Sequence, residues 1–335
     1  MDKQKSFDDD FEDKIMALDY DSLAQIFMWL PVSQRIVMEN VCHKWKEACQ
    51  RSWYDIKKYK CGVLIGGNYK NRLLTQSFLE KILLRCGVYL KELALSRVCN
   101  SSIFPIVGEH CKNLTRLEFV FDETSKKLTK EEIIAISKNC KKLKHLEIPC
   151  CKVTSTDREE RLSCPFFLDD LSKLQYLEYL DLSCIKILQD STIIMIADKC
   201  EHLKYLNIEG PNKLTDIGFN ALTSLENLQE LTIDGNMTIT NNFVKKFKGL
   251  RVLNCRGCPN LTDANIIQVI KNCPDLEQLD LSFSDNITLD AIIAADLATK
   301  NRINEIVLHI HISNWTLYEA SKSKIESQWL LVEYL

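Results

Sequence analysis

The sequence predicts an α/β protein in which a short all-helical module precedes a curved array of strand–helix units. Three observations support this architecture. Residues 90–311 repeat the pattern L-x-x-L-x-L, most copies are followed by a stretch with helical periodicity, and residues 15–53 carry helical periodicity without the repeat. In such an array we expect parallel strands on the concave face and helices on the outside.

The leucines define the repeat unit. The copies begin at Leu90, Leu114, Leu143, Leu177, Leu203, Leu228, Leu250 and Leu276, and a divergent copy, INEIVL, begins at Ile303. Successive copies lie 22 to 34 residues apart, and all but one spacing fit the roughly 20–29 residues of leucine-rich repeats. Because one unit cannot bury its own apolar face, nine copies in series predict a single solenoid with a continuous core.

The second half of each unit is expected to be helical. We predict helices over 131–138, 191–199 and 263–271, with Ile133, Ile134 and Ile136 facing the strand leucines. Four cysteines occupy one repeat position, three residues before a strand leucine: Cys111, Cys140, Cys200 and Cys273. A fixed position in the repeat predicts thiols packed in the core.

The segment from Leu18 to Trp53 differs in kind from the repeats. Its apolar residues begin with a stripe at i, i+3, i+4 and i+7, made by Leu23, Ile26, Phe27 and Leu30. Pro31 ends this helix, and Ser33 is a candidate N-cap for a second one. Helices this short are not stable alone, so they must pack on the next domain, on a partner, or on both.

This segment resembles an F-box. The residues that match the F-box pattern are Leu18, Asp21, Leu23, Ile26, Phe27, Leu30, Val41, Cys42, Trp45 and Trp53. Asp19 stands where the family usually has proline, and His43 where lysine or arginine is common. Aspartate is itself a good helix cap, so Asp19 weakens the start of the motif without abolishing it. With its cysteine-containing repeats, the chain is similar to F-box/leucine-rich-repeat proteins over 15–311.

The resemblance implies a non-catalytic substrate-recognition subunit of an SCF-type ubiquitin ligase. The F-box would dock the Skp-family adaptor, which leads to a cullin–RING ligase, and the repeats would hold a substrate protein. The residues expected to contact the adaptor are Leu18, Leu23, Ile26, Phe27, Leu30, Val41 and Trp45. Two alternatives stay open: a leucine-rich-repeat scaffold without a ubiquitin-ligase role, and a repeat protein whose front helices form only an N-terminal cap.

The concave face is expected to bind the substrate. At the third, fifth, seventh and eighth repeat positions the acids are Glu92, Glu118, Glu147, Asp181, Glu209, Glu230, Asp234, Asp280 and Glu305, and the bases are Arg97, Arg116 and Arg256. We expect substrate contacts at Glu118, Phe121, Glu147, Tyr179, Asp181, Tyr205, Asp280 and Phe283. Aromatic residues among acids predict a partner with a basic, partly apolar surface, such as a Lys/Arg-rich peptide. Alternatively, these acids are only solvated.

The expected domains are an acidic flexible tail (1–14), the helical module (15–53), a transition with a first irregular repeat (54–89), the solenoid (90–311) and a C-terminal cap (312–335). The transition should contain a strand over 60–65 and a helix over 75–85. The one oversized spacing places an insertion at 153–167, which is either a surface loop or a loop that contacts a partner. In the cap, the residues expected to cover the last repeat are Trp329, Leu330, Leu331 and Tyr334.

The sequence predicts no catalytic, cofactor or metal site. Cys255 and Cys258 form a C-x-x-C, but the natural third ligand, Cys273, belongs to a repeat position. His309 and His311 share one strand face without an evident third ligand. No glycine-rich phosphate loop is present among the 10 glycines. We therefore expect neither an enzyme nor a cofactor.

Composition and charge exclude several classes of protein. The net charge of -3 favours neither nucleic acid nor membranes as a partner, and no apolar run reaches the ~18 residues of a transmembrane helix. The N-terminus lacks the apolar core of a signal peptide. The 15 cysteines, an odd number, then favour a reducing compartment, cytoplasmic or nuclear, in which most are buried thiols.

Overall fold

The computed structural model describes residues 14–62, 76–96, 100–120, 129–149, 166–185, 188–210, 214–238 and 246–335. The tail up to residue 13, Phe121, Arg97 and the insertion up to residue 165 lie outside the described residues. Within the described ranges, no helix is both long and apolar enough to cross a membrane.

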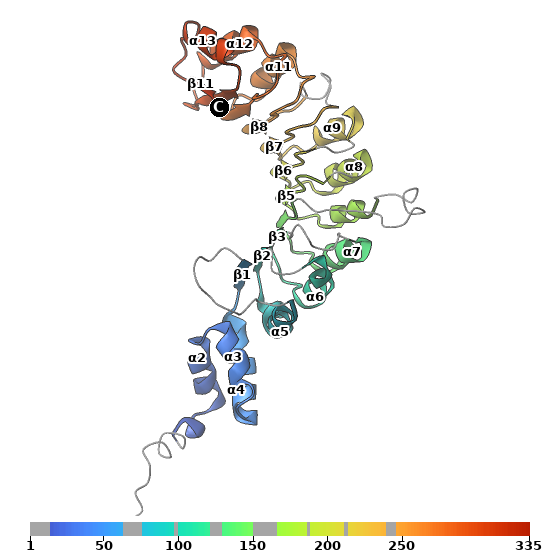
Figure 1. The fold of residues 1–335 in the computed structure, drawn as a ribbon, viewed down its shortest axis with the longest axis vertical. Helices are drawn as coiled ribbons and strands as arrows, with labels where there is room; N and C mark the ends of the chain where they lie inside the picture. Colours follow the sequence, from blue (N-terminus) through green and yellow to red (C-terminus); the bar gives the residue numbers. More distant parts are fainter. Residues whose placement is uncertain are drawn as a thin grey trace, which may run out of the picture.

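The described strands form one parallel sheet of 11 strands, in sequence order. The strands are β1 (Lys58–Gly62), β2 (Glu92–Ser96), β3 (Arg116–Val120), β4 (His145–Glu147), β5 (Tyr179–Asp181), β6 (Tyr205–Asn207), β7 (Glu230–Thr232), β8 (Val252–Asn254), β9 (Gln278–Asp280), β10 (Leu308–Ile312) and β11 (Leu330–Tyr334). Figure 1 shows the sheet as the inner side of an arc. The predicted α/β solenoid is confirmed.

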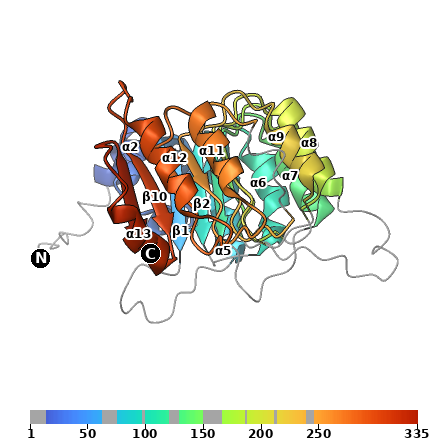
Figure 2. The same ribbon diagram turned by 90° about the horizontal axis from the view of Figure 1, so that it is seen from above.

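The outer side of the arc carries the helices that return the chain to the next strand. They are α5 (Gln76–Cys86), α6 (Phe104–His110), α7 (Lys130–Asn139), the 3-10 helix η4 (Phe166–Lys173), α8 (Asp190–Lys199), α9 (Asp216–Leu222), α11 (Asp263–Asn272), α12 (Leu289–Thr299) and α13 (Trp315–Lys322). Figure 2 looks along the array and shows α6 to α9 grouped beside the strands. The three helices predicted for the second halves of repeats are confirmed. Ile133 and Ile136 are buried, whereas Ile134 is only half-buried.

The repeat positions have clear physical roles. The strand leucines are buried in one continuous core, and the in-phase cysteines end the outer helices. The thiol of Cys140 donates to the carbonyl of Cys111 one repeat earlier, at 3.7 Å. A side-chain contact between neighbouring repeats has a similar effect, since Asp263 accepts from both the main-chain N–H (2.8 Å) and the hydroxyl (2.5 Å) of Thr288. Each repeat thus satisfies polar groups of its neighbour, and the Cys140 bond does so in the buried core.

The ninth copy of the repeat was placed wrongly. His309, not Glu305, pairs with Gln278 in the sheet, so the strand begins only at Leu308, the last residue of the INEIVL segment. Ile303 is 97% exposed, and Glu305 has a φ of 58°, which no strand residue adopts. The alternating sequence of β10 supplies the buried positions instead, with Leu308, Ile310 and Ile312 facing the core.

The C-terminal segment extends the sheet by one strand. β11 pairs in parallel with β10, and Leu330 and Val332 are buried in the common core. The side chains of Leu331 and Tyr334 are exposed. Of the residues expected to cover the last repeat, Leu330 therefore packs into the core, while Leu331 and Tyr334 point out of it.

Three short helices precede the solenoid: α2 (Tyr20–Met28), α3 (Val32–Met38) and α4 (His43–Ser52). Asp19 caps α2 by accepting the N–H of Ser22 at 2.7 Å, as its capping propensity predicted. The prediction that Ser33 caps the second helix is wrong, because Pro31 holds the N-cap position and Ser33 lies in the first turn. In Figure 1 the module projects from the N-terminal end of the arc.

Candidate interaction surfaces

The helical module has its own small core. Leu23 and Phe27 of α2 are buried against Ala48 and Cys49 of α4, and the ring of Phe27 lies 5.3 Å from that of Trp45. Three further predicted adaptor contacts, Leu18, Leu30 and Trp45, pack half-buried against this core. These residues stabilise the module, so only their outer edges are open to a partner.

The module also exposes large apolar side chains. Ile26 is 43% exposed and Val41 is 56% exposed, and both were predicted to contact an adaptor. The structure adds Trp29, at 90%, and Val37, at 59%, which the sequence argument missed. For Trp29 the spacing was the available signal, because it lies three residues after Ile26, at the C-cap of the same helix. Val41 lies in the turn after α3, so helical spacing does not relate it to Val37.

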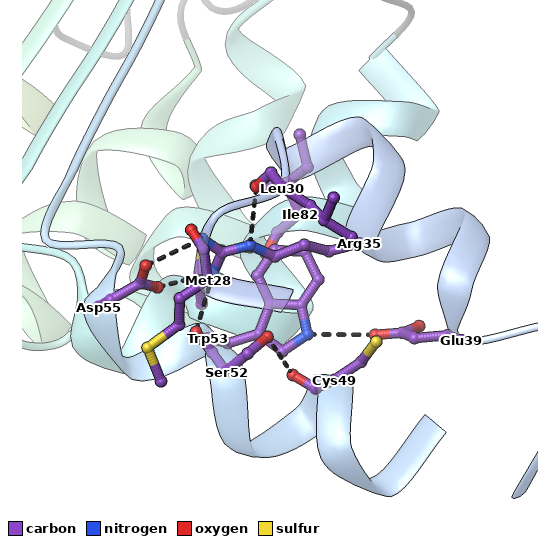
Figure 3. A network of polar contacts seen from close by, with 10 residues as sticks. Met28, Leu30, Arg35, Glu39, Cys49, Ser52, Trp53, Asp55 and Ile82 are labelled. Carbon is purple, nitrogen blue, oxygen red and sulfur yellow. Dashed lines mark hydrogen bonds and ion pairs between the residues drawn. The ribbon is translucent and has the colours of Figure 1, made fainter. Parts of the chain in front are cut away.

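A buried arginine joins the three helices of the module. The side chain of Arg35 is only 2% exposed. It donates to the carbonyls of Met28 (2.6 Å), Leu30 (3.1 Å) and Ser52 (2.8 Å), and makes two bonds to the carboxylate of Asp55. Figure 3 shows these partners arranged around the guanidinium. One side chain thereby neutralises Asp55 and satisfies three carbonyls at helix ends.

A second polar contact joins the module to the solenoid. Glu39 accepts from the indole N–H of Trp53 at 3.1 Å and from Nε of Arg85, in the outer helix α5, at 2.8 Å. The indole ring of Trp53 is buried in the same core as the repeat leucines. In Figure 3 the bond from Trp53 to Glu39 lies beside the Arg35 cluster. The position of the module on the first repeat is therefore determined by side chains as well as by chain connectivity.

On the concave face, the strand register brings third-position residues of successive repeats side by side. His145, Tyr179 and Tyr205 are neighbours on β4, β5 and β6. Their rings stack in parallel, with centroids 3.9 Å apart in both pairs and interplanar angles of 14° and 3°. Desolvation and a hydrogen bond to Tyr205 raise the pKa of the Tyr179 hydroxyl. We call these three rings the ring stack.

Many of the predicted acids on this face are paired within the chain. Arg116 on β3 binds the carboxylate of Glu118 and also approaches that of Glu147, at 3.5 Å. His145 contacts Glu147 as well, and Lys58 binds Glu92 at 2.7 Å. These cations compensate the carboxylates near β2 to β4, so the count of nine acids overstates the negative charge there. The count also includes Glu305, which precedes β10 and lies outside the face.

The remaining negative charge lies over β5 to β9. Asp181 accepts from the N–H of Ser183 and from the amide of Asn207, and Asp280 accepts from the N–H of Ser282. Asp234 accepts the main-chain N–H of Arg256. Desolvation, together with the charges of Asp280 and Glu209, raises the pKa of Asp234 to about 6. Burial is thus the main cause of the raised pKa, and the two neighbouring carboxylates add to it.

The ring stack borders an open hollow of about 510 Å³. Its lining residues are Lys144, His145, Glu178, Tyr179, Lys204, Tyr205, Gln229 and Glu230. Glu178 accepts from Lys144 at 2.7 Å and from Lys204 at 2.8 Å, and these bonds lower the pKa of Glu178 to about 2. The two lysines are thus drawn toward one carboxylate at the rim of the hollow.

The remaining predicted contact, Phe283, lies apart from the ring stack. It follows β9 in a left-handed conformation, with φ 58°, and its side chain is exposed. The guanidinium of Arg256 lies 4.7 Å from its ring centroid, a cation–π arrangement. The structure therefore brings Tyr179, Tyr205 and Asp181 together but does not bring Phe283 to them.

Two groups on this face contain metal-type ligands. Within the described ranges, the ligand atoms of Glu118, His145 and Glu147 all lie within 4.8 Å of one another. Arg116 already supplies the positive charge that a cation would bring to these carboxylates. The sequence argument also missed that Glu333 contacts both His309 (3.4 Å) and His311 (2.8 Å).

The C-x-x-C pair belongs to the core. Cys255 and Cys258 are fully buried, and their thiols donate to the carbonyls of Asp280 (3.2 Å) and Ile233 (3.4 Å). Burial raises the pKa of Cys258 to about 12. The cysteines that the structure describes are free thiols, and most of them are buried, as predicted.

Comparisons with known proteins support the fold and the relationship. No model of a known protein family matches the chain. The Caenorhabditis elegans "Putative RNA-binding protein EEED8.10" is 24% identical over 78% of this chain and 42% of its own length. Mouse F-box/LRR-repeat protein 12 is 24% identical over 64% of this chain and 61% of its own length. The chain thus spans about two fifths of one relative and three fifths of the other.

A solved structure has the same fold. A chain in the crystal structure of the yeast Rad7 and Elc1 complex matches with a TM-score of 0.51 at 16% identity, over 97% of this chain and 92% of that one. A second F-box protein, bovine F-box/LRR-repeat protein 4, is 28% identical over 31% of this chain and 22% of its own length. In its repeat fold, in the residues that match the F-box pattern and in these matches, the chain is distantly similar to F-box/leucine-rich-repeat proteins.

Proposed function

We propose that the chain is the substrate-recognition subunit of an SCF-type ubiquitin ligase. The helical module docks a Skp-family adaptor, and the concave face of the repeats holds a substrate protein. The observation that carries the proposal is the exposed apolar surface of a module whose own core is already complete, namely Ile26, Trp29, Val37 and Val41.

Exposed apolar side chains on a small module favour a docking role. Solvation of such side chains is unfavourable, and contiguous apolar surface typically marks an interaction site. A tryptophan that is 90% exposed, such as Trp29, is the residue type that most often contributes strongly to binding at an interface. Ile26 and Val41 also match the F-box motif, so the exposed residues and the resemblance coincide.

The proposed contribution to ubiquitination is proximity. A chain that binds adaptor and substrate at once converts an encounter in solution into an intramolecular one, which raises the effective concentration of substrate lysines at the enzyme. The bonds of Glu39 to Trp53 and Arg85 support this role, because they limit how far the module can move relative to the repeats.

The docking part is tested by co-purification with a Skp-family adaptor. We expect Trp29→Ala combined with Ile26→Ala to weaken adaptor binding at least tenfold, because the loss of one interface hot spot costs roughly 2 kcal/mol or more. Circular dichroism should be unchanged, since both side chains are exposed. Ile217→Ala combined with Leu297→Ala removes two equally exposed side chains from the outer helices and should leave adaptor binding intact.

The ligase role needs a separate readout. We expect a cullin to co-purify with the intact chain and a bound substrate to be ubiquitinated in a reconstituted reaction. If adaptor binds but no cullin or ubiquitin transfer follows, the chain is a scaffold. If the folded chain ignores the adaptor, the docking proposal is wrong.

A protein substrate fits the concave face better than a nucleic acid. The nematode relative is named for RNA binding, and RNA would bring phosphates to this face. Asp181, Asp234 and Asp280 place negative charge there, and Lys144 and Lys204 are engaged by Glu178. Phosphates would be repelled, because nucleic-acid affinity depends on unpaired basic side chains.

A further inference from the structure

The ring stack has two different ends. Tyr179 is covered on both faces, by His145 and by Tyr205. At the His145 end, Nη1 of Arg116 lies 3.3 Å from the imidazole Nδ1, and the guanidinium is held by Glu118 and Glu147. The chain therefore closes one end of the stack with its own arginine and two carboxylates.

The Tyr205 end has the same kind of neighbours without the arginine. The next residue in the row is Glu230 on β7, which pairs with Tyr205 in the sheet register and is exposed. Tyr205 and Glu230 both line the 510 Å³ hollow. Arg251, whose charge interacts with that of Glu230, is bound to Glu277 at 2.5 Å. An aromatic ring and a carboxylate thus border open space.

The charged lining of the hollow is balanced, with Lys144 and Lys204 against Glu178 and Glu230, but both lysines bind Glu178 rather than Glu230. Lys144 and Lys204 share Glu178, so their charge is partly compensated at the rim. On the same face, Asp181 accepts from two neutral groups, the N–H of Ser183 and the side-chain amide of Asn207. A planar guanidinium can stack on a tyrosine face and bind a carboxylate with two parallel N–H groups, which an ammonium cannot do.

We propose that the hollow beside Tyr205 is a subsite for an arginine side chain of the substrate protein. The guanidinium stacks on the outer face of Tyr205 and donates to Glu230. Arg116 likewise lies beside the last ring at the opposite end, although it contacts the edge of His145. This inference rests on the proposed function and specifies it: the substrate presents an arginine, not merely a basic surface, to β6 and β7.

The test uses the full chain and three short probes: acetyl-Gly-Gly-Arg-Gly-Gly-amide and its lysine and citrulline counterparts. Affinities are measured by ligand-observed NMR titration. We expect the arginine peptide to bind about threefold more tightly than the lysine peptide, and the neutral citrulline peptide to bind most weakly, since an exposed cation–π contact is worth about 0.5–1 kcal/mol. Because both cationic peptides are attracted equally to the acidic face, the ratio of their affinities reports only the preference for arginine.

Variants assign the preference to named side chains. Tyr205→Leu should reduce the arginine-to-lysine ratio to about one, whereas Tyr205→Phe should retain it. Glu230→Gln should weaken both cationic peptides about fivefold. Tyr176→Leu and Glu226→Gln, at exposed positions away from the hollow, are the matched controls and should change nothing.

Several outcomes would overturn the subsite. One is equal affinity for the arginine and lysine peptides, and another is an arginine preference that persists in Tyr205→Leu. A third is a single-stranded oligouridylate that binds more tightly than the arginine peptide and loses affinity in Tyr205→Leu. Adaptor co-purification is measured on the same samples. Absent arginine preference with intact adaptor binding refutes the subsite alone, whereas absent adaptor binding refutes the proposed function.

Discussion

Glu39 of the helical module and Arg85 of the first outer helix face each other across the junction between module and repeats. The arginine Nε lies 2.8 Å from both carboxylate oxygens, and the carboxylate side chain is only 8% exposed. Glu39 also accepts the indole N–H of Trp53, so one buried carboxylate contacts two segments that belong to the repeat core. A rigid junction follows, because loss of the Arg85 contact leaves the carboxylate buried without its cation and loss of the Trp53 contact leaves a buried indole N–H unpaired.

Replacing Arg85 should loosen this junction. We expect Arg85→Ala to lower the free energy of unfolding by about 1–3 kcal/mol, because Glu39 stays buried with a single remaining donor. Denaturant titration measures the loss. A double-mutant cycle with Glu39→Gln should recover at least half of it, since the neutral amide no longer needs the guanidinium.

The control for this prediction is an exposed ion pair. Arg251 and Glu277 are both substantially exposed, so Arg251→Ala should cost at most about 1 kcal/mol. Equal losses for the Arg85 and Arg251 variants would show that the junction contact does not contribute more than a surface ion pair.

Arg35 should be essential for the module and not for the repeats. We expect Arg35→Ala to destabilise the module by roughly 3–5 kcal/mol, because it leaves the Asp55 carboxylate without its cation and three helix-end carbonyls without a donor. Hydrogen–deuterium exchange should rise in α2 to α4 and stay unchanged in α8 and α9. Arg51→Ala, which removes an exposed arginine of α4, should leave all of these helices protected. Uniform loss of protection would contradict separate stability of the two parts.

The leucine spacing predicted the repeats because each leucine has the same buried environment in every unit. The spacing gave a wrong prediction at Ile303. Apolar residues recur there at the repeat spacing, but the chain forms an exposed turn before β10. The leucine pattern arises because those positions are buried. A single divergent copy contains too few leucines to determine which of its residues pair in the sheet.

The interaction surfaces were harder to predict for two reasons. Whether Leu23 or Trp29 faces outward depends on how α2 packs on α4, which one helical stripe does not determine. Charge pairing on the concave face depends on contacts between distant positions, such as Arg116 with Glu147, which are 31 residues apart. A count of acids in sequence therefore gave the sign of the face but not where the uncompensated charge lies.

The cysteines should differ in reactivity according to burial. Desolvation raises the pKa of Cys140 and Cys200 to about 12, so almost no thiolate is present at neutral pH. Cys42 and Cys184 are partly exposed. We expect iodoacetamide to modify Cys42 and Cys184 in the folded chain and Cys140 and Cys200 only in denaturant, as read by peptide mass spectrometry. Equal modification rates for Cys140 and Cys42 without denaturant would contradict the buried repeat position.

Asp234 should make stability depend on pH in a defined direction. Its pKa rises from 3.8 to about 6 on folding, chiefly because of desolvation, so the folded chain binds the proton more tightly than the unfolded chain. Protonation therefore favours folding below about pH 4, and this contribution is lost as the pH rises through 6. Asp234→Asn, whose amide oxygen can still accept the N–H of Arg256, should stabilise the protein by about 1–3 kcal/mol at pH 8.

The difference between this variant and the parent chain should disappear at pH 4, where both carry a neutral side chain. Thermal unfolding across that range measures it, and Asp285→Asn, at an exposed position near the same end of the sheet, is the control. A constant difference at all pH values would mean that packing, not the charge of Asp234, is responsible. A stabilisation confined to high pH would show that the desolvated charge of Asp234, with the smaller repulsion from Asp280 and Glu209, costs stability on the concave face.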